Sequence, residues 1–224
     1  MAWPIQSTGL ENMTGKNGML LASGDYSEVK VYDGRVPKNI YGNLQRVSQL
    51  VGWHYGWNTP SNPEARYWHH EIGYGNKQNR ECVAAKVKEH PASIFAVYQS
   101  WLLEQFPPDT RILRFYMNAY TFGTDGWPHT DTDRTGDVTA LLYLNPVWQP
   151  AWGGETTMFD ENGDVTLAVL PANNRLMVFP SDQLHAPRPL SRAFNGLRVV
   201  LVVRLGFASS EEELENEQKQ VGEG

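Results

Sequence analysis

The stretch that decides the fold is RILRFYMNAY, residues 111–120, because the hydrophobic pattern changes there from helical spacing to strand spacing. Turn residues, mainly Gly, Asn and Pro, separate the segments that come after it. Five more strand-like segments follow, at 138–144, 156–160, 165–170, 175–179 and 197–205. Short strands at this spacing predict an antiparallel sandwich or barrel, the group to which jelly rolls and cupins belong.

The residues before this block have a different pattern. Apolar residues recur at helical spacing over 39–53 and over 93–106, and the pair Pro107-Pro108 ends the second helix. One half-buried strand is expected at 28–32, and the Pro-containing segment 54–74 is expected to be a loop with short strands. Helices first and strands second indicate an α+β fold, in which helices support one face of a double-stranded barrel.

Three regions follow from these patterns: a helical and loop support region over 1–110, the barrel over 111–207 and an acidic tail over 208–224. Most of the net charge of −6 lies in the tail, which has six Glu and one Lys. The rest of the chain is nearly neutral and offers no basic face to nucleic acid. This charge distribution favours small or neutral partners.

Cysteine usage and hydropathy indicate a cytoplasmic protein. Cys82 is the single cysteine, so no internal disulfide forms, which fits a reducing compartment. Residues 1–18 lack the apolar segment of a signal peptide, and the longest apolar stretch, 199–203, is too short to cross a bilayer. We therefore expect a soluble protein without a membrane partner, and the sequence predicts no particular oligomeric state.

Two candidate metal ligands, His129 and Asp131, follow the first strand of the block after a Gly-rich turn. In an extended chain the side-chain period is two, so both point to the same side. His185 comes from a distant part of the block and supplies a third ligand. Two histidines and one carboxylate suit non-haem Fe(II) and leave coordination positions open. Asp133 is the alternative carboxylate, but it lies about 13 Å of extended chain from His129, which favours Asp131.

Three further histidines, His54, His69 and His70, are rival ligands. Adjacent residues of a strand point to opposite faces, so only one of His69 and His70 could join a site. Packing among the many aromatic residues of 54–74 is the default expectation for them.

Arg198 opens the apolar run 199–203, where a buried cation is costly unless it is paired. The carboxylate of a bound 2-oxo acid would give its guanidinium a bidentate partner. Arg204 has the same parity on this strand and is an alternative anchor, while Arg188 and Arg192 lie in the preceding loop.

Residues 111–205 resemble the prolyl-4-hydroxylase-like Fe(II)/2-oxoglutarate-dependent oxygenases. The matching blocks are PHTD at 128–131, LYLNP at 142–146 with Trp148, WGGET at 152–156, RLMVF at 175–179, Ser181 and Asp182 leading to His185, and Arg198. The order of these blocks is far more specific than any one of them. The resemblance implies a double-stranded β-helix core of the jelly-roll or cupin-like type.

The resemblance also implies roles for individual residues. It makes His129, Asp131 and His185 the iron ligands and Arg198 the 2-oxoglutarate anchor. Tyr120 and Tyr143 look like the tyrosines that hydrogen-bond this cosubstrate. The spacing from His185 to the anchor is longer than usual in the family, so Arg192 stays an alternative to Arg198.

The implied enzyme is a dioxygenase that uses Fe(II), 2-oxoglutarate and O2, with ascorbate as a reductant. It would oxidise a C–H bond of a small molecule, an amino acid or a peptidyl side chain and release succinate and CO2. Hydroxylation is the expected form of this oxidation. Two alternatives stay open: a nucleic-acid dealkylating oxygenase, suggested by the spacing of Arg198 and Arg204, and a cupin-like metal-binding protein without 2-oxoglutarate. Neither the substrate nor the oxidised carbon follows from the sequence.

Overall fold

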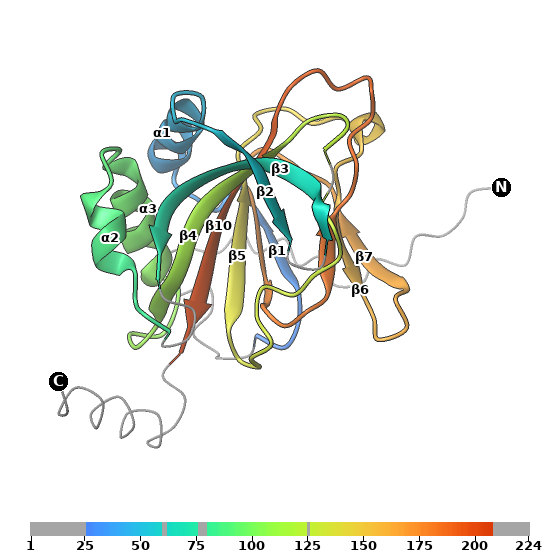
Figure 1. Ribbon diagram of the computed structural model, residues 1–224. Helices are drawn as coiled ribbons and strands as arrows, with labels where there is room; N and C mark the ends of the chain where they lie inside the picture. The colour runs from blue at the N-terminus through green and yellow to red at the C-terminus, as the bar shows by residue number, and fades with distance from the viewer. Residues whose placement is uncertain (1–25, 60–61, 76–79, 125, 208–224) are drawn as a thin grey trace.

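The computed structural model describes residues 26–59, 62–75, 80–124 and 126–207. Within these ranges, ten strands form two sheets that lie face to face (Figure 1). The major sheet has seven strands in the order β1-β8-β5-β10-β4-β3-β2, and the minor sheet has three in the order β7-β6-β9. Every strand pair is antiparallel, as the spacing of the turns predicts.

The three described helices lie before β4 in the chain, and the strands from β4 to β10 follow them. The strands are β1 Lys30–Asp33, β2 His54–Thr59, β3 Asn62–Tyr74, β4 Arg111–Tyr120, β5 Val138–Tyr143, β6 Thr156–Phe159, β7 Val165–Val169, β8 Arg175–Pro180, β9 His185–Pro187 and β10 Arg198–Gly206. The helices are α1 Lys38–Ser48, α2 Ala84–Glu89 and α3 Ile94–Leu103, with a 3-10 turn at Pro150–Trp152. In the described part of the chain, no helix is both long and apolar enough to cross a bilayer.

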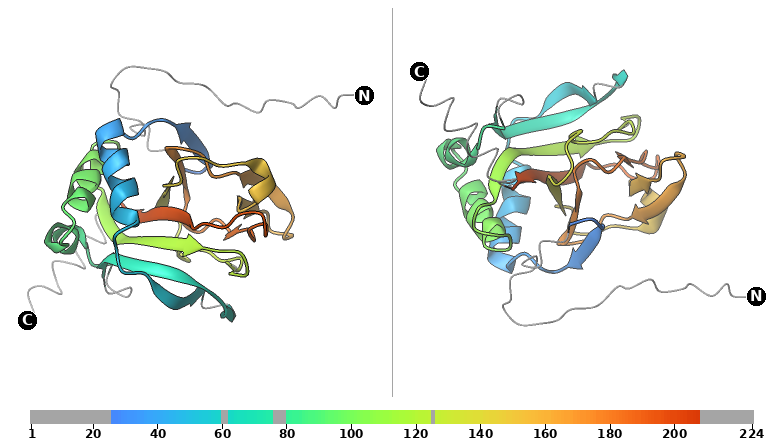
Figure 2. Two further views of the ribbon diagram at one scale, coloured as in Figure 1. Left: turned by 90° about the horizontal axis from the view of Figure 1, so that it is seen from above. Right: turned by 90° about the horizontal axis from the view of Figure 1, so that it is seen from below.

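The helices cover one face of the major sheet and the minor sheet covers part of the other, so the molecule has three layers (Figure 2). The side chains of α1 and α3 that face the sheet, such as Leu44, Phe95 and Leu102, are fully buried. They belong to the same apolar core as Phe115 and Met117 of β4. This layer therefore fixes the major sheet from behind and leaves its other face for the site.

Strand β10 runs through the centre of the major sheet and has a different role on each face. Its odd-numbered residues Val199, Leu201 and Val203 belong to the helix-side core, whereas Val200 and Val202 belong to the core between the sheets. The period of two explains this division. Arg198 and Arg204 have the same parity as Val200 and Val202. The side chains of the two arginines therefore leave β10 on the face that lies between the sheets.

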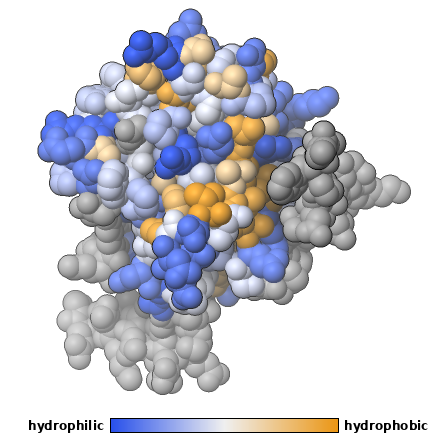
Figure 3. Space-filling model, turned by 90° about the vertical axis from the view of Figure 1, so that its right-hand side faces the viewer, coloured by the Kyte–Doolittle hydropathy of each residue, from blue (hydrophilic) through white to orange (hydrophobic). Residues whose placement is uncertain are grey.

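The minor sheet has an exposed outer strand. The first four residues of β7 are exposed, and Val165 and Leu167 are among the exposed large hydrophobic side chains. The side of the molecule on which β6 and β7 lie carries a hydrophobic patch bordered by hydrophilic residues (Figure 3). Strand β7 is therefore an outer edge of the molecule, while β6 and β9 lie closer to the site.

Most predicted elements are confirmed, and segment 54–74 is the main correction. The strand at 111–120 has the predicted bounds, and the five later strands lie within one or two residues of theirs. Segment 54–74 forms β2 and the 13-residue strand β3, which join the major sheet beside β4, instead of a loop with short strands. Its buried alternation over Ala65, Tyr67 and His69 is hidden in the sequence because one of the three is polar. Helix α2 and strand β9 were not predicted.

Candidate metal centre and the adjoining pocket

His129 and His185 lie opposite each other in an isolated antiparallel bridge. The backbone N–H of His129 donates to the carbonyl of His185 over 2.9 Å, and the reverse bond is 3.0 Å long. Two residues on, the N–H of Asp131 donates to the carbonyl of Ser181 over 2.8 Å. These bonds hold the segment with His129 and Asp131 extended, so that both side chains face one side, as their spacing predicts.

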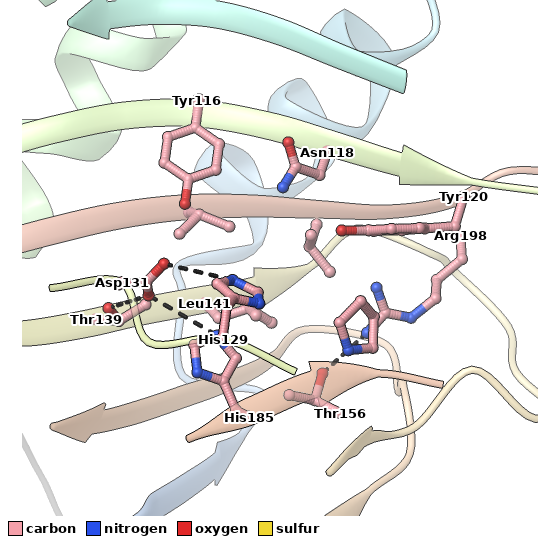
Figure 4. Close-up of a pocket in the computed structure, with 13 residues that line it drawn as sticks. Tyr116, Asn118, Tyr120, His129, Asp131, Thr139, Leu141, Thr156, His185 and Arg198 are labelled. Atoms are coloured by element: carbon pink, nitrogen blue, oxygen red, sulfur yellow. Dashed lines mark hydrogen bonds and ion pairs between the residues drawn. The ribbon is translucent and has the colours of Figure 1, made fainter. Parts of the chain in front are cut away.

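The three predicted ligands meet at one point (Figure 4). Among the residues that the structure describes, His129, Asp131 and His185 are the group whose ligand atoms lie within 4.8 Å of one another. The Nε2 atoms of His129 and His185 are 3.8 and 3.9 Å from the two carboxylate oxygens of Asp131.

Both histidine rings are oriented by backbone carbonyls. Nδ1 of His129 lies 2.8 Å from the carbonyl of Trp127, and Nδ1 of His185 lies 2.9 Å from that of Gln183. A carbonyl only accepts, so each Nδ1 carries the proton and each Nε2 presents its lone pair toward Asp131. Two imidazole Nε2 atoms and a carboxylate aimed at one point are the donors that a divalent transition metal requires.

Asp131 is held and kept charged by its surroundings. Its carboxylate accepts a 2.6 Å hydrogen bond from the hydroxyl of Thr139, which is itself 2.8 Å from the hydroxyl of Ser181. Burial opposes the charged carboxylate, but His185, His129, Thr139 and a nearby arginine outweigh it and lower the pKa of Asp131. Burial lowers the pKa of His185, which keeps its ring neutral and able to bind a metal.

The rival ligands lie elsewhere. Asp133 is exposed and lies outside the cluster, so the structure places Asp131 at the centre instead. His69 and His70 do point to opposite faces of β3: Nδ1 of His69 bonds Asn118, and Nδ1 of His70 bonds the carbonyl of Gly52. His54 pairs across β2 and β3 with His69 and is exposed.

Arg198 is buried at the other end of the pocket, with 1% of its surface exposed. Its Nε donates to the carbonyl of Gly154 over 2.6 Å, and its Nη2 donates to the hydroxyl of Thr156 over 2.9 Å. Its Cζ lies 5.3 Å from the ring centres of both Tyr120 and Tyr143. No carboxylate of the described residues forms an ion pair with it. A buried cation without an acidic partner is what an anionic ligand requires.

The alternative anchors have other contacts. Arg192 is exposed and stacks over the ring of Phe122 at 5.3 Å. Arg204 donates from Nη1 to the backbone carbonyl of Asp131 over 2.8 Å, so it supports the segment that carries His129 and Asp131.

The two predicted tyrosines have different positions. Tyr120 lines the pocket beside Arg198 (Figure 4). Tyr143 is fully buried and is not among the lining residues, because its hydroxyl lies 2.7 Å from that of Thr156 and 3.2 Å from the carbonyl of Val169. Thr156 therefore stands between Tyr143 and the pocket.

Several lining residues were not singled out from the sequence. They come from three strands, β4, β5 and β6, and they contribute hydroxyl and amide groups between the two ends of the pocket: Tyr116, Asn118, Thr139 and Thr156. One signal could have found Asn118, since it is the one amide in the otherwise apolar and aromatic run 115–120 and has the same parity as Tyr116 and Tyr120.

Comparison with known proteins agrees with this geometry. Residues 115–203 match the family model of the 2OG-Fe(II) oxygenase superfamily, a span that contains all three clustered ligands and Arg198. No curated protein sequence matches the chain.

Several solved structures have a similar fold. One is a prolyl hydroxylase from Trichoplax adhaerens in complex with a hypoxia-inducible-factor peptide fragment, with 17% identity, a TM-score of 0.57 and coverage of 87% of this chain and 89% of that one. A prolyl-4-hydroxylase from Pseudomonas putida has 20% identity, a TM-score of 0.54 and coverage of 79% and 91%. HygX from Streptomyces hygroscopicus, with nickel and 2-oxoglutarate bound, has 14% identity, a TM-score of 0.55 and coverage of 84% and 86%. At these identities the likeness is one of fold.

Proposed function

We propose that this chain is a prolyl-4-hydroxylase-like 2OG-Fe(II) oxygenase that hydroxylates a C–H bond of a small molecule, an amino acid or a peptidyl side chain. Its cofactors are Fe(II), 2-oxoglutarate and O2. Iron bound with the oxo acid and O2 supplies the oxidation, in which 2-oxoglutarate is converted to succinate and CO2 while the C–H bond becomes C–OH.

The triad holds the metal in this proposal. His129 and His185 bind through Nε2, because their Nδ1 protons are engaged with backbone carbonyls. Asp131 binds through its carboxylate, which Thr139 orients by a 2.6 Å hydrogen bond. Three protein ligands leave the remaining positions for the cosubstrate and O2.

The main support for the proposal is the environment of Arg198. A buried arginine in the pocket distinguishes an oxo-acid-dependent enzyme from a cupin-like metal protein. The guanidinium of Arg198 is buried, is stacked between two tyrosine rings and has no acidic partner in the described chain. A ligand carboxylate at this end of the pocket would neutralise it, and a guanidinium fork suits a carboxylate. We therefore assign Arg198 as the anchor of the distal 2-oxoglutarate carboxylate.

Two hydroxyl groups complete this anchor. Tyr120 lines the pocket directly, so its hydroxyl is a donor to the cosubstrate. The hydroxyl of Thr156 accepts from Arg198 and receives that of Tyr143 at 2.7 Å, so its own proton is left for the ligand. In this chain Tyr143 thus acts on the cosubstrate through Thr156.

We further propose that residues 111–207 form a double-stranded β-helix catalytic core. The two facing antiparallel sheets and the position of the triad between them support this arrangement. Strands β1, β2 and β3 then extend the core sheet from the N-terminal region 26–110.

The proposed substrate class rests on the charge of the chain and on the structural relatives. The chain is acidic overall, with a net charge of −6, which argues against a polyanionic nucleic acid. Among the structural relatives, the Trichoplax enzyme holds a peptide fragment and HygX has been solved with hygromycin B. We therefore keep small-molecule and peptidyl substrates together as one proposed class.

The test is anaerobic titration of the Fe(II)-loaded protein with 2-oxoglutarate. A metal-to-ligand charge-transfer absorption should develop in the wild type and be absent in His129→Ala. Arg198→Ala should bind Fe(II) normally and need much more 2-oxoglutarate. Asp131→Asn should lose Fe(II), whereas the matched control Asp133→Asn should keep it, because Asp133 is exposed. A wild type that binds Fe(II) but shows neither the absorption nor succinate release in air would refute the oxygenase proposal.

A further inference from the structure

A polar chain crosses the inner face of β3 and β4 and ends in the pocket. His69 of β3 lies directly opposite Asn118 of β4 in the strand register. Nδ1 of His69 is 2.7 Å from Oδ1 of Asn118, and the hydroxyl of Tyr74 is 3.0 Å from Nε2 of the same ring. Asn118 lines the pocket, while His69 and Tyr74 lie behind it.

The direction of each hydrogen bond in this chain can be assigned. Burial lowers the pKa of His69 to about 4, so its ring is neutral at pH 7 and carries one proton. The amide oxygen of Asn118 only accepts, which puts that proton on Nδ1. Nε2 then accepts from the hydroxyl of Tyr74. As a result the Asn118 oxygen is occupied, and its NH2 group is turned to the pocket (Figure 4).

The His69 ring is held in place on both sides. The ring of Trp57 stacks on it at 4.1 Å between centres and an interplanar angle of 8°. Tyr116 lies 5.3 Å away and is tilted by 37°. Because His69 is 4% exposed and packed between aromatic rings, it can fix the rotation of the Asn118 amide rather than follow it.

The pocket gives the Asn118 amide an evident partner. Asn118 lies on β4 between Tyr116, which is near Asp131, and Tyr120, which is near Arg198 (Figure 4). A ligand that extends from the triad to Arg198 would pass beneath it. Along this roof one N–H of the Asn118 amide donates to the hydroxyl oxygen of Tyr120, and the second N–H is left for a ligand.

We propose that His69 is a positioning residue, which together with Tyr74 holds the Asn118 amide as a donor to the carboxylate or keto oxygens of the bound 2-oxoglutarate. This inference rests on the proposed function. A charge-assisted hydrogen bond of this kind corresponds to roughly a 10- to 100-fold change in affinity. None of Tyr74, His69 and Asn118 belongs to the triad, so Fe(II) binding should not depend on these three residues.

The experiment compares two variants with opposite losses. His69→Phe keeps a ring for the stack on Trp57 but has no donor, whereas His69→Asn keeps a donor at the place of Nδ1 but loses the ring. The 2-oxoglutarate affinity of the anaerobic Fe(II)-loaded protein is measured from the charge-transfer absorption. We expect His69→Phe to bind 2-oxoglutarate roughly 10- to 100-fold more weakly and His69→Asn to bind within a few-fold of wild type. A purely structural His69 would give the reverse order.

A double variant and a spectroscopic measurement complete the test. Asn118→Leu should weaken 2-oxoglutarate about as much as His69→Phe, and the double variant should be no weaker than Asn118→Leu alone, since His69 acts only through Asn118. Nitrogen NMR of the metal-free wild type should show the Nδ1–H tautomer of His69, a result that does not require any variant to fold.

Three outcomes overturn the inference: additive losses in the double variant, unchanged 2-oxoglutarate affinity in His69→Phe, or the Nε2–H tautomer. In each of these cases a wild type that still binds 2-oxoglutarate leaves the proposed function intact. If the wild type itself binds Fe(II) but no 2-oxoglutarate, the proposed function fails and the inference fails with it.

Discussion

Replacing Thr139 by Val should weaken metal binding without touching a metal ligand. The Thr139 hydroxyl donates a 2.6 Å hydrogen bond to the carboxylate of Asp131, and the side chain is fully buried. Valine has nearly the same shape, so the change removes this donor and little else. A hydrogen bond to a charged group contributes about 1.5–3 kcal/mol, which corresponds to roughly a 10- to 100-fold loss of affinity. Partners that orient a metal ligand have effects of the same size.

The variant has a second consequence, for stability. The Ser181 hydroxyl is fully buried and lies 2.8 Å from that of Thr139, so Thr139→Val removes its partner. An unsatisfied buried hydroxyl costs about 1–3 kcal/mol. The double variant Thr139→Val/Ser181→Ala should therefore recover part of the lost unfolding free energy while its metal affinity stays low.

The assay measures Fe(II) affinity by anaerobic competition with a chelator and the unfolding free energy by urea titration of the metal-free protein. Thr110→Val is the matched control, because Thr110 is also buried and its hydroxyl also donates over 2.6 Å, to the carbonyl of Pro107. The control should lose stability and keep its metal affinity. The reasoning is refuted if Thr139→Val binds Fe(II) as the wild type does, or if Thr110→Val loses as much affinity.

Two further predictions concern a glycine and a histidine pair. Gly154 and Gly163 both have positive φ values, of +73° and +84°, but a Cβ on Gly154 would lie 2.7 Å from Cδ2 of Leu190 and 3.1 Å from Cδ of Arg198, whereas one on Gly163 would meet nothing within 4 Å. Both Ala variants should lose roughly 1–2 kcal/mol of stability from the backbone conformation, and Gly154→Ala should lose more because of its close contacts. Only Gly154→Ala should bind 2-oxoglutarate more weakly in the same titration, by at least about tenfold; equal binding would contradict this. The Nε2 atoms of His70 and His90 are 3.2 Å apart, and burial lowers the pKa of both below the ordinary 6.5. The unfolded chain then binds protons that the folded chain does not, so the unfolding free energy should fall as pH drops below 6.5. Urea titrations at pH 7.5 and 5.5 should show a smaller fall in His90→Gln, and an unchanged fall would count against the pair.

The central strands and the spacing of the ligands could be predicted because each depends on local periodicity. The period of two puts His129 and Asp131 on one side, and the backbone bonds to His185 and Ser181 keep that segment extended. Arg198 stood out because it interrupts an apolar run, and it is buried as that pattern indicates.

The groups that orient these residues could not be predicted, because their partners are distant in sequence. Thr139 of β5 meets Asp131 and Ser181 only when β5 and β8 pair. The alternation of buried residues in β3 includes His69, and a histidine in a sequence is not expected to be buried, so the strand pattern is not recognised. Thr156 of β6 lies between Tyr143 and the pocket, so the hydroxyl of Tyr143 bonds Thr156 instead of lining the pocket. This arrangement depends on how the two sheets pack.

Strand β10 explains why its two arginines do different work. Arg198 and Arg204 share the inner face, but six residues of strand separate them by about 20 Å. Arg204 reaches the carbonyl of Asp131 and so stabilises the segment that carries two of the three ligands. Arg198 has only neutral partners, Gly154 and Thr156, and keeps its charge available. One strand therefore supplies a cation that supports the segment with His129 and Asp131 and a second cation that has no acidic partner among the described residues. In the proposed function, this second cation binds the distal carboxylate of 2-oxoglutarate.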